Sequence, residues 1–128
     1  MHTQNFHTHT FRCGHAKGDA PDYAVAARDA GLTVLGISDH TPLPDGWTPE
    51  IRMDMQELEG YLAAIRQAAQ TPGINVIAGM ECDIAKRYFK FYRDELLAPH
   101  RCRYLIGALH YYTHKSEEIY AGLIPGAA

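Results

Sequence analysis

Histidine and glutamate side chains recur at the ends of the short apolar runs of this chain, and this pattern constrains its fold most strongly. The residues are spread over about a hundred positions and are His7, His9, His15, His40, Glu81 and His110. Successive parallel strands of an α/β fold end on a common face, so residues this far apart in sequence can converge on one pocket. Imidazoles and carboxylates are ligands for divalent transition metals. The pattern therefore predicts a metal-binding pocket at the ends of several strands.

The pair His7 and His9 is the sharpest part of the pattern. Residues i and i+2 of a strand point to the same side, so both imidazoles can reach one cation. For the pair alone, the alternative is two surface histidines on an edge strand. The repetition of such residues in five segments favours the metal site.

Glu81 lies between two apolar residues, Met80 and Cys82. In a strand both neighbours face away from Glu81, so its carboxylate is expected to project into the pocket. A carboxylate at a strand end can bridge two metal ions. The alternative is that Glu81 ends a strand in solvent.

Strand and helix patterns alternate along the chain, as in the βα units that build a parallel sheet. Strands are predicted over residues 5–9, 32–38, 74–78 and 103–109, and helices over 22–30, 54–65 and 88–97. Segment 41–48, with two prolines and Trp47, is expected to be an irregular loop over the strand ends. No element is expected from Glu117 onward. A length of 128 residues favours one domain.

Composition, net charge and hydropathy argue against several classes of protein for this sequence. A formal charge of −3 gives no basic field, so a nucleic-acid surface is not expected. Neither a membrane span nor a signal peptide is visible, and a cytoplasmic location is expected. Cys13, Cys82 and Cys102 form no CxxC pair and fit reduced thiols. Cys13 is near enough to the histidines to contact a metal, although a small semi-buried loop residue is the favoured interpretation.

Five segments in order resemble one family. FHTHTFRCGHA, ISDHTPLP, IRMDMQELEGYLAAI, AGMECD and YLIGALHY resemble the first four strand units of the PHP (polymerase and histidinol phosphatase) metal-dependent phosphoesterases. The resemblance is strongest to histidinol-phosphate phosphatases of the PHP type and spans roughly residues 5–112. Several linked motifs in the right order are more specific than any one of them.

This resemblance implies an α/β fold, the first four βα units of a distorted (βα)7 TIM-like barrel that holds up to three metal ions (Zn, Mn or Fe). It implies that His7 and His9 hold one metal with Glu81, and that Glu81 bridges to a second metal held also by His110. His15 and His40 would hold the third. The remaining ligands of the family, a further histidine and a late Asp-x-His pair, have no clear match in this chain.

The implied activity is hydrolysis of L-histidinol phosphate to L-histidinol and phosphate in histidine biosynthesis. Two alternatives stay open. One is another PHP phosphoesterase with a nucleotide or phosphotyrosine substrate, and the other is a non-catalytic metal-binding or assembly module with an incomplete site. A complete barrel needs about 250 residues. Residues 1–128 are therefore expected to be the N-terminal part of a PHP domain, either a fragment or a homo-oligomer formed through open sheet edges.

Four further residues are weaker candidates. Asp39 is a candidate catalytic residue beside Glu81, either bonded to a ligand imidazole or capping the proline-rich loop. Arg12, Lys17 and Arg52 are candidate contacts for the substrate phosphate, with a solvated cation as the alternative for each. Three more histidines, His2, His100 and His114, are expected on the surface.

Overall fold

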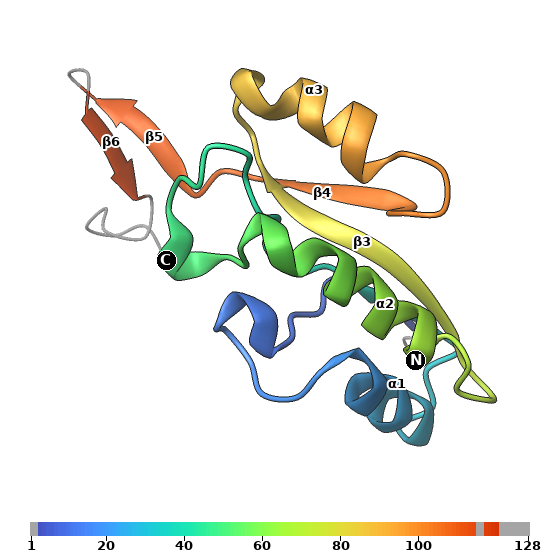
Figure 1. Cartoon of the computed structure of the whole chain (residues 1–128). Coiled ribbons are helices and arrows are strands. Elements are labelled where there is room, and N and C mark those ends of the chain that lie inside the picture. Colours follow the sequence, from blue (N-terminus) through green and yellow to red (C-terminus); the bar gives the residue numbers. More distant parts are fainter. Residues whose placement is uncertain (1–2, 115–116, 121–128) are drawn as a thin grey trace.

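The computed structural model describes residues 3–114 and 117–120. At its centre is a parallel sheet in the order β1-β2-β3-β4, formed by Gln4–Asn5, Val34–Ile37, Asn75–Asp83 and Tyr104–Ala108. The sheet curls, and helices connect its strands (Figure 1). This arrangement confirms the predicted α/β half of a TIM-like barrel.

Helices form in the three predicted places. Helix α1 (Ala20–Asp29) begins at Asp19, whose side chain forms a capping box with Asp22. Helix α2 (Leu58–Ala68) follows the short turn Met55–Glu57, which Asp54 caps in the same way. The third helical segment is irregular, because it passes from a 3₁₀ turn through α geometry into a π turn. Its parts are Lys86–Tyr88, α3 (Phe89–Phe91) and Tyr92–Leu96, and two more 3₁₀ turns lie at Phe11–Cys13 and Pro49–Ile51.

Strand β3 pairs with two different strands in succession. Residues 75–78 pair with β2, and residues 79–83 pair with β4. Beyond the end of β2, the Glu81 N–H donates to the Asp39 carbonyl at 2.9 Å, and the Thr41 N–H donates to the Glu81 carbonyl at 2.9 Å. This bridge aligns His40 with Glu81. Aligned residues of parallel neighbours point to the same side of the sheet, so these two side chains share a face.

Tyr61 of α2 fixes the sheet where β2 ends. It is 1% exposed, and its hydroxyl donates to the Gly79 carbonyl at 2.6 Å. The Asp39 N–H donates to the same hydroxyl at 3.3 Å. One buried side chain thus satisfies backbone groups of β3 and of the segment after β2, which holds the start of that segment in place.

Tyr104 fills the opposite face of the sheet. Its ring lies over Gly36 and Gly79, where a methyl group at either position would overlap the ring. Its hydroxyl donates to the Phe6 carbonyl at 2.6 Å. This β4 side chain therefore spans β3 and β2 and reaches the end of β1, and the two glycines are what make room for it.

Two expectations about strands were wrong. The tail contains β6 (Glu117–Tyr120), which pairs antiparallel with β5 (Tyr111–His114), although no element was expected there. Strand β1 ends at Asn5, so the two histidines that follow it lie beyond the ladder. The Ser38 N–H still donates to the Thr8 carbonyl at 2.8 Å and holds this extended segment beside β2.

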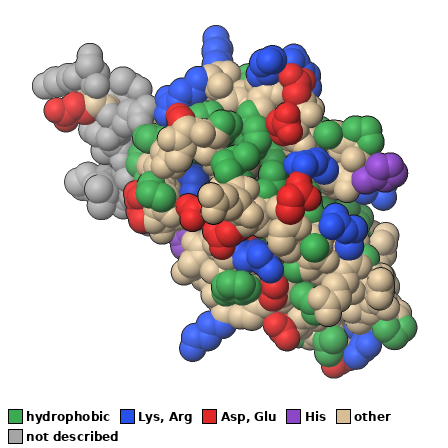
Figure 2. All heavy atoms as spheres, in the orientation of Figure 1, with side chains coloured by type: hydrophobic (Ala, Val, Ile, Leu, Met, Phe, Trp, Pro, Cys, Tyr) green, Lys and Arg blue, Asp and Glu red, His purple; other side chains and the backbone are tan. Residues whose placement is uncertain are grey.

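The helices lie against the outer side of the curled sheet, and the hairpin projects from the end of β4 (Figure 1). Figure 2 shows acidic and basic side chains intermingled over the face turned to the viewer, so this face has no surface of a single charge sign. Within residues 3–114 and 117–120, no helix has both the length and the apolar composition that crossing a membrane requires.

Candidate metal centre

All six residues of the predicted pocket line one cavity of about 320 Å³. Ile51 also lines this cavity. The complete lining is His7, His9, His15, His40, Ile51, Glu81 and His110. Most of these residues follow a strand of the sheet, and Glu81 lies within β3. The parallel strands thus deliver side chains from distant parts of the sequence to one end of the half-barrel, as the sequence pattern predicted.

The carboxylate of Glu81 lies at the centre of the histidine side chains that line this cavity. Its Oε2 lies 3.2 Å from the Nε2 of His7, 3.0 Å from the Nε2 of His9 and 3.5 Å from the Nδ1 of His40. Its Oε1 lies 3.5 Å from the Nε2 of His110. The two carboxylate oxygens therefore face different imidazoles, which is the arrangement that bridging of two cations requires.

Met80 and Cys82 face away from the cavity, as predicted. Both are buried in the hydrophobic core. Glu81 is also buried, yet its carboxylate reaches the cavity. Neighbouring residues of a strand point to opposite sides, so Glu81 faces the polar site while Met80 and Cys82 face the apolar core.

His40 is buried at the inner side of the cavity, and His15, which is exposed, lies beside it. Their ring centroids are 4.7 Å apart, and the ring of His40 lies 4.7 Å from those of His9 and His110. His40 is thus in contact with both ends of the cluster. His7 differs from His40, because 51% of its side chain is exposed and it lies at the cavity mouth.

The imidazoles of the cavity and the carboxylate of Glu81 shift one another's pKa values. Burial by itself raises the pKa of Glu81, but hydrogen bonds from His110 and His9 outweigh it and hold that pKa well below its usual range. The hydrogen bonds to Cys13 and Glu81 raise the pKa of His9 to about 10. Those to Asp83 and Glu81 raise the pKa of His110 to about 9. Burial lowers the pKa of His40 to about 4, so His40 is a neutral imidazole.

Asp39 lies behind the cavity and does not line it. Its carboxylate accepts the N–H and the hydroxyl of Thr10, each at 2.5 Å, and the thiol of Cys13 at 3.3 Å. It lies 3.8 Å from the Nδ1 of His9. Asp39 is fully buried, so it acts on the cavity through the loop that carries His9. Its catalytic role stays a prediction.

Cys13 contacts two of the histidines. Its Sγ lies 3.3 Å from the Nδ1 of His9 and 3.3 Å from the Nδ1 of His15. The Nε2 of His9 faces Glu81, so Cys13 occupies the opposite edge of that ring. Cys13 was expected to be a small semi-buried loop residue; it does lie in the loop, but it is fully buried and contacts both rings.

Asp83 is a functional residue that the sequence analysis missed. Its Oδ1 lies 2.8 Å from the Nδ1 of His110, and its Oδ2 forms an ion pair at 2.8 Å with Arg52. A carboxylate on one ring nitrogen fixes the tautomer and aims the other nitrogen at the cavity. The available signal was its position two residues after Glu81, on the same side of β3.

The three candidate phosphate contacts lie outside the lining of the cavity. Arg12 forms an ion pair with Asp19 at 2.8 Å, and Lys17 is exposed on the loop before α1. Arg52 is buried and also donates to the Thr41 carbonyl at 2.9 Å, so it holds the loop over the strand ends. Phosphate binding by these cations stays a prediction. The expected surface position holds for His100, whereas His2 and the side chain of His114 lie outside the described residues.

The donor set fits divalent transition metals. Three groups of side chains bring possible ligand atoms within 4.8 Å of one another: His7, His9 and Glu81; His40, Glu81 and His110; and His9, Cys13, His15 and His40. The His40 Nδ1 is buried without a hydrogen-bond partner in the part of the chain that the structure describes, and it lies 3.5 Å from the Glu81 Oε2. Buried polar atoms without partners cost free energy, and a cation between them removes that cost.

Comparison with known proteins agrees with this geometry. The family described as the PHP domain matches residues 5–124. The "Probable histidinol-phosphatase" of Deinococcus radiodurans is 37% identical over 107 residues, which make up 82% of this chain and 41% of that protein. The crystal structure of a "putative histidinol phosphatase" from Listeria monocytogenes has the same fold, with a TM-score of 0.79 at 19% identity.

The structural match covers 97% of this chain and 51% of the Listeria protein. The chain thus spans about half or less of the length of these two relatives. The family match covers nearly the whole chain and includes every residue of the histidine cavity. The chain belongs to the PHP domain family.

Proposed function

We propose that this chain forms the metal site of a phosphomonoesterase that hydrolyses L-histidinol phosphate to L-histidinol and phosphate, a step of histidine biosynthesis. The observation that carries the proposal is the convergence of five imidazoles in one cavity, four of which face the two oxygens of Glu81. The names of the two relatives support the substrate.

The site is proposed to depend on Zn, Mn or Fe, since imidazoles and carboxylates suit these metals. His7, His9 and Glu81 would hold one ion, Glu81 and His110 a second, and His15 and His40 a third. Bound at this site, the ions supply charge neutralisation of the phosphate and a more acidic water. No serine or cysteine nucleophile is needed for this chemistry.

The residues of the chain itself prepare the site. The negative charge of Glu81 persists at neutral pH, because neighbouring imidazoles hold its pKa low. The Asp83 carboxylate fixes the Nδ1 proton of His110, so the Nε2 of that ring can act as a ligand. His40 stays neutral through burial and offers a lone pair without first losing a proton.

The test is to measure metal content and phosphate release together. The double variant His7→Ala, His9→Ala should lose most of its metal and its phosphate release from L-histidinol phosphate, because it removes two of the three donors of one group. A matched control is Gln67→Ala, Gln70→Ala, which changes two exposed side chains near the end of α2.

Unchanged metal stoichiometry in the histidine double variant would overturn the assignment of the site. Metal binding without turnover of any phosphomonoester would favour the non-catalytic module. Faster turnover of nucleotides or phosphotyrosine than of L-histidinol phosphate would favour another PHP phosphoesterase.

A further inference from the structure

Arg52 is a buried arginine that joins three segments of the chain near the histidine cavity. Its side chain is 2% exposed. Its Nη1 donates to the Thr41 carbonyl at 2.9 Å, and its Nε donates to the Thr48 hydroxyl at 3.0 Å. Its Nη2 lies 2.8 Å from the Oδ2 of Asp83 at the end of β3. Each guanidinium nitrogen therefore faces a different segment, and the planar group fixes the three segments relative to one another.

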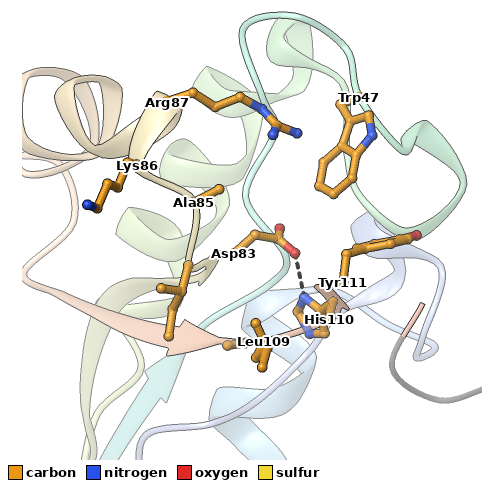
Figure 3. A pocket seen from close by; sticks show the side chains of 10 residues that line it. Trp47, Asp83, Ala85, Lys86, Arg87, Leu109, His110 and Tyr111 are labelled. Carbon is orange, nitrogen blue, oxygen red and sulfur yellow. Dashed lines mark hydrogen bonds and ion pairs between the residues drawn. The ribbon is translucent and has the colours of Figure 1, made fainter. Parts of the chain in front are cut away.

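The ion pair between Arg52 and Asp83 leads directly to a side chain of the cavity. Neither the Nη2 of Arg52 nor the Oδ2 of Asp83 forms a hydrogen bond with another group of residues 3–114 and 117–120, so each of these atoms depends on the ion pair. The other carboxylate oxygen of Asp83 contacts the Nδ1 of His110 (Figure 3). A guanidinium, a carboxylate and an imidazole thus form one row, which ends with the Nε2 of His110 at 3.5 Å from Glu81.

The segment that Arg52 holds also forms part of the cavity wall. Thr48 has a backbone φ of 49°, in the left-handed region that β-branched residues rarely adopt. The hydrogen bonds from Arg52 to the Thr48 hydroxyl and, at 3.3 Å, to the Thr48 carbonyl support this conformation. Three residues later, Ile51 lines the histidine cavity. The guanidinium that holds this wall is thus the one that holds Asp83.

We infer that Arg52 is a positioning residue of the metal site. It orients the Asp83 carboxylate that aims His110 at Glu81, and through the same guanidinium it couples the order of residues 41–51 to the occupancy of the site. Energetic coupling between two sites is reciprocal, so a metal that fixes His110 also stabilises the loop, and a loosened loop weakens metal binding. The inference rests on the metal site of the proposed function, and it does not require the phosphatase activity.

A cycle of single and double variants separates this role from that of an arginine that only supports the fold. Arg52→Gln should weaken zinc binding about tenfold, and Arg52→Lys should recover part of the affinity, because its ammonium can still pair with Asp83. Arg52→Gln combined with Asp83→Asn should bind zinc no more weakly than Asp83→Asn alone, since Arg52 acts through that carboxylate. The effects of independent residues would instead multiply. Competition with a chromophoric chelator measures each affinity.

Arg101→Gln is the matched control for this cycle. Arg101 also pairs with a carboxylate, that of Glu59, but lies outside the lining of the histidine cavity. Thermal midpoints of the same samples show which variants fold. If Arg52→Gln does not fold, the cycle is run with Arg52→Lys, which should bind zinc about threefold more weakly than the wild-type chain. Wild-type affinity in the variant used, or effects that multiply in the double variant, would overturn the inference.

Hydrogen exchange measured by mass spectrometry tests the coupling to the loop. At zinc concentrations that saturate each protein, zinc should slow amide exchange in residues 41–51 several-fold in the wild-type chain and in Arg101→Gln. The same addition should have little effect on this segment in the Arg52 variant. Equal protection by zinc with and without the arginine, or no protection in the wild-type chain, would refute the coupling.

Phosphate release keeps this inference and the proposed function apart. Effects of Arg52 and Asp83 that do not multiply, with no hydrolysis of L-histidinol phosphate, would support Arg52 as a positioning residue and refute the proposed phosphatase. Hydrolysis of L-histidinol phosphate by a chain in which the two effects on zinc affinity multiply would refute the role of Arg52 and leave the phosphatase in place.

Discussion

The carboxylate of Asp83 and the imidazole of His110 lie 2.8 Å apart, and the ring has its other nitrogen directed at Glu81. Asp83 thus controls a residue of the cavity without lining that cavity itself. Partners of this kind commonly change metal affinity by about 10- to 100-fold when they are removed.

Asp83→Asn should therefore weaken metal binding by about 10- to 100-fold, because an amide in place of the carboxylate leaves the ring orientation and the Nδ1 proton of His110 less well fixed. Competition with a chromophoric chelator measures the affinity. Asp29→Asn is the control, since Asp29 is exposed at the end of α1. Equal affinities for the wild-type chain and Asp83→Asn would show that the contact has no such role.

Glu81→Gln should remove metal binding and phosphate release while the chain still folds. The substitution keeps the shape of the side chain but removes the negative charge that faces four imidazoles. Metal analysis and the thermal midpoint, measured on the same sample, separate the two effects. Glu59→Gln serves as comparison, because Glu59 is exposed and pairs with Arg101 on the surface. Near-normal phosphate release from Glu81→Gln would show that Glu81 does not bridge metals.

Cys13→Ala should lower metal affinity more than Cys13→Ser. The hydroxyl of serine can keep a hydrogen bond to the imidazoles of His9 and His15, whereas a methyl group cannot. Isothermal titration with zinc compares the two variants. Cys102→Ala removes a buried thiol elsewhere in the core and should leave affinity unchanged. The same affinity in Cys13→Ala and the wild-type chain would contradict a role for this thiol.

The metal-free protein should be most stable near pH 6.5. The pKa values of His9 (about 10) and His110 (about 9) are raised above 6.5, so their contributions are complete below pH 6.5 and are lost as pH rises through 9 and 10. The pKa of His40 is lowered from 6.5 to about 4, so its contribution is complete above pH 6.5 and is lost as pH falls toward 4.

Urea unfolding of chelator-treated protein between pH 4 and pH 10 checks this expectation. His110→Gln should remove the loss of stability around pH 9, because the variant lacks that imidazole, and should leave the loss that His9 causes toward pH 10. A free energy of unfolding that rises steadily from pH 6.5 to pH 10 would contradict the assignment.

Local patterns were sufficient to predict the parallel sheet of βα units and the six residues of the cavity, and the family resemblance identified that sheet as half of a TIM-like barrel. An apolar run followed by histidine or glutamate identifies a strand and its functional end at the same time. The sequence could not show that Asp83 holds His110, since this pair depends on how far the chain turns after β4. The β5–β6 hairpin was missed because a strand in a polar stretch is stabilised by its partner more than by its own sequence.

Arg52 shows a second limit of prediction from the sequence. A basic residue on a loop near the site suggests contact with substrate, but its guanidinium is buried and pairs with Asp83. Burial of an arginine is determined by the tertiary fold, because its long side chain can turn inward or outward from the same backbone position.

The alternation of Met80, Glu81 and Cys82 also limits how β3 can assemble. A shift of one residue in its pairing would turn Glu81 into the apolar core and bring Met80 or Cys82 to the histidines. Misaligned forms of the sheet would then bury an uncompensated carboxylate, which costs several kcal/mol. The residue placed to bridge the ions thus also acts during folding, by penalising every neighbouring register of the strand that carries it.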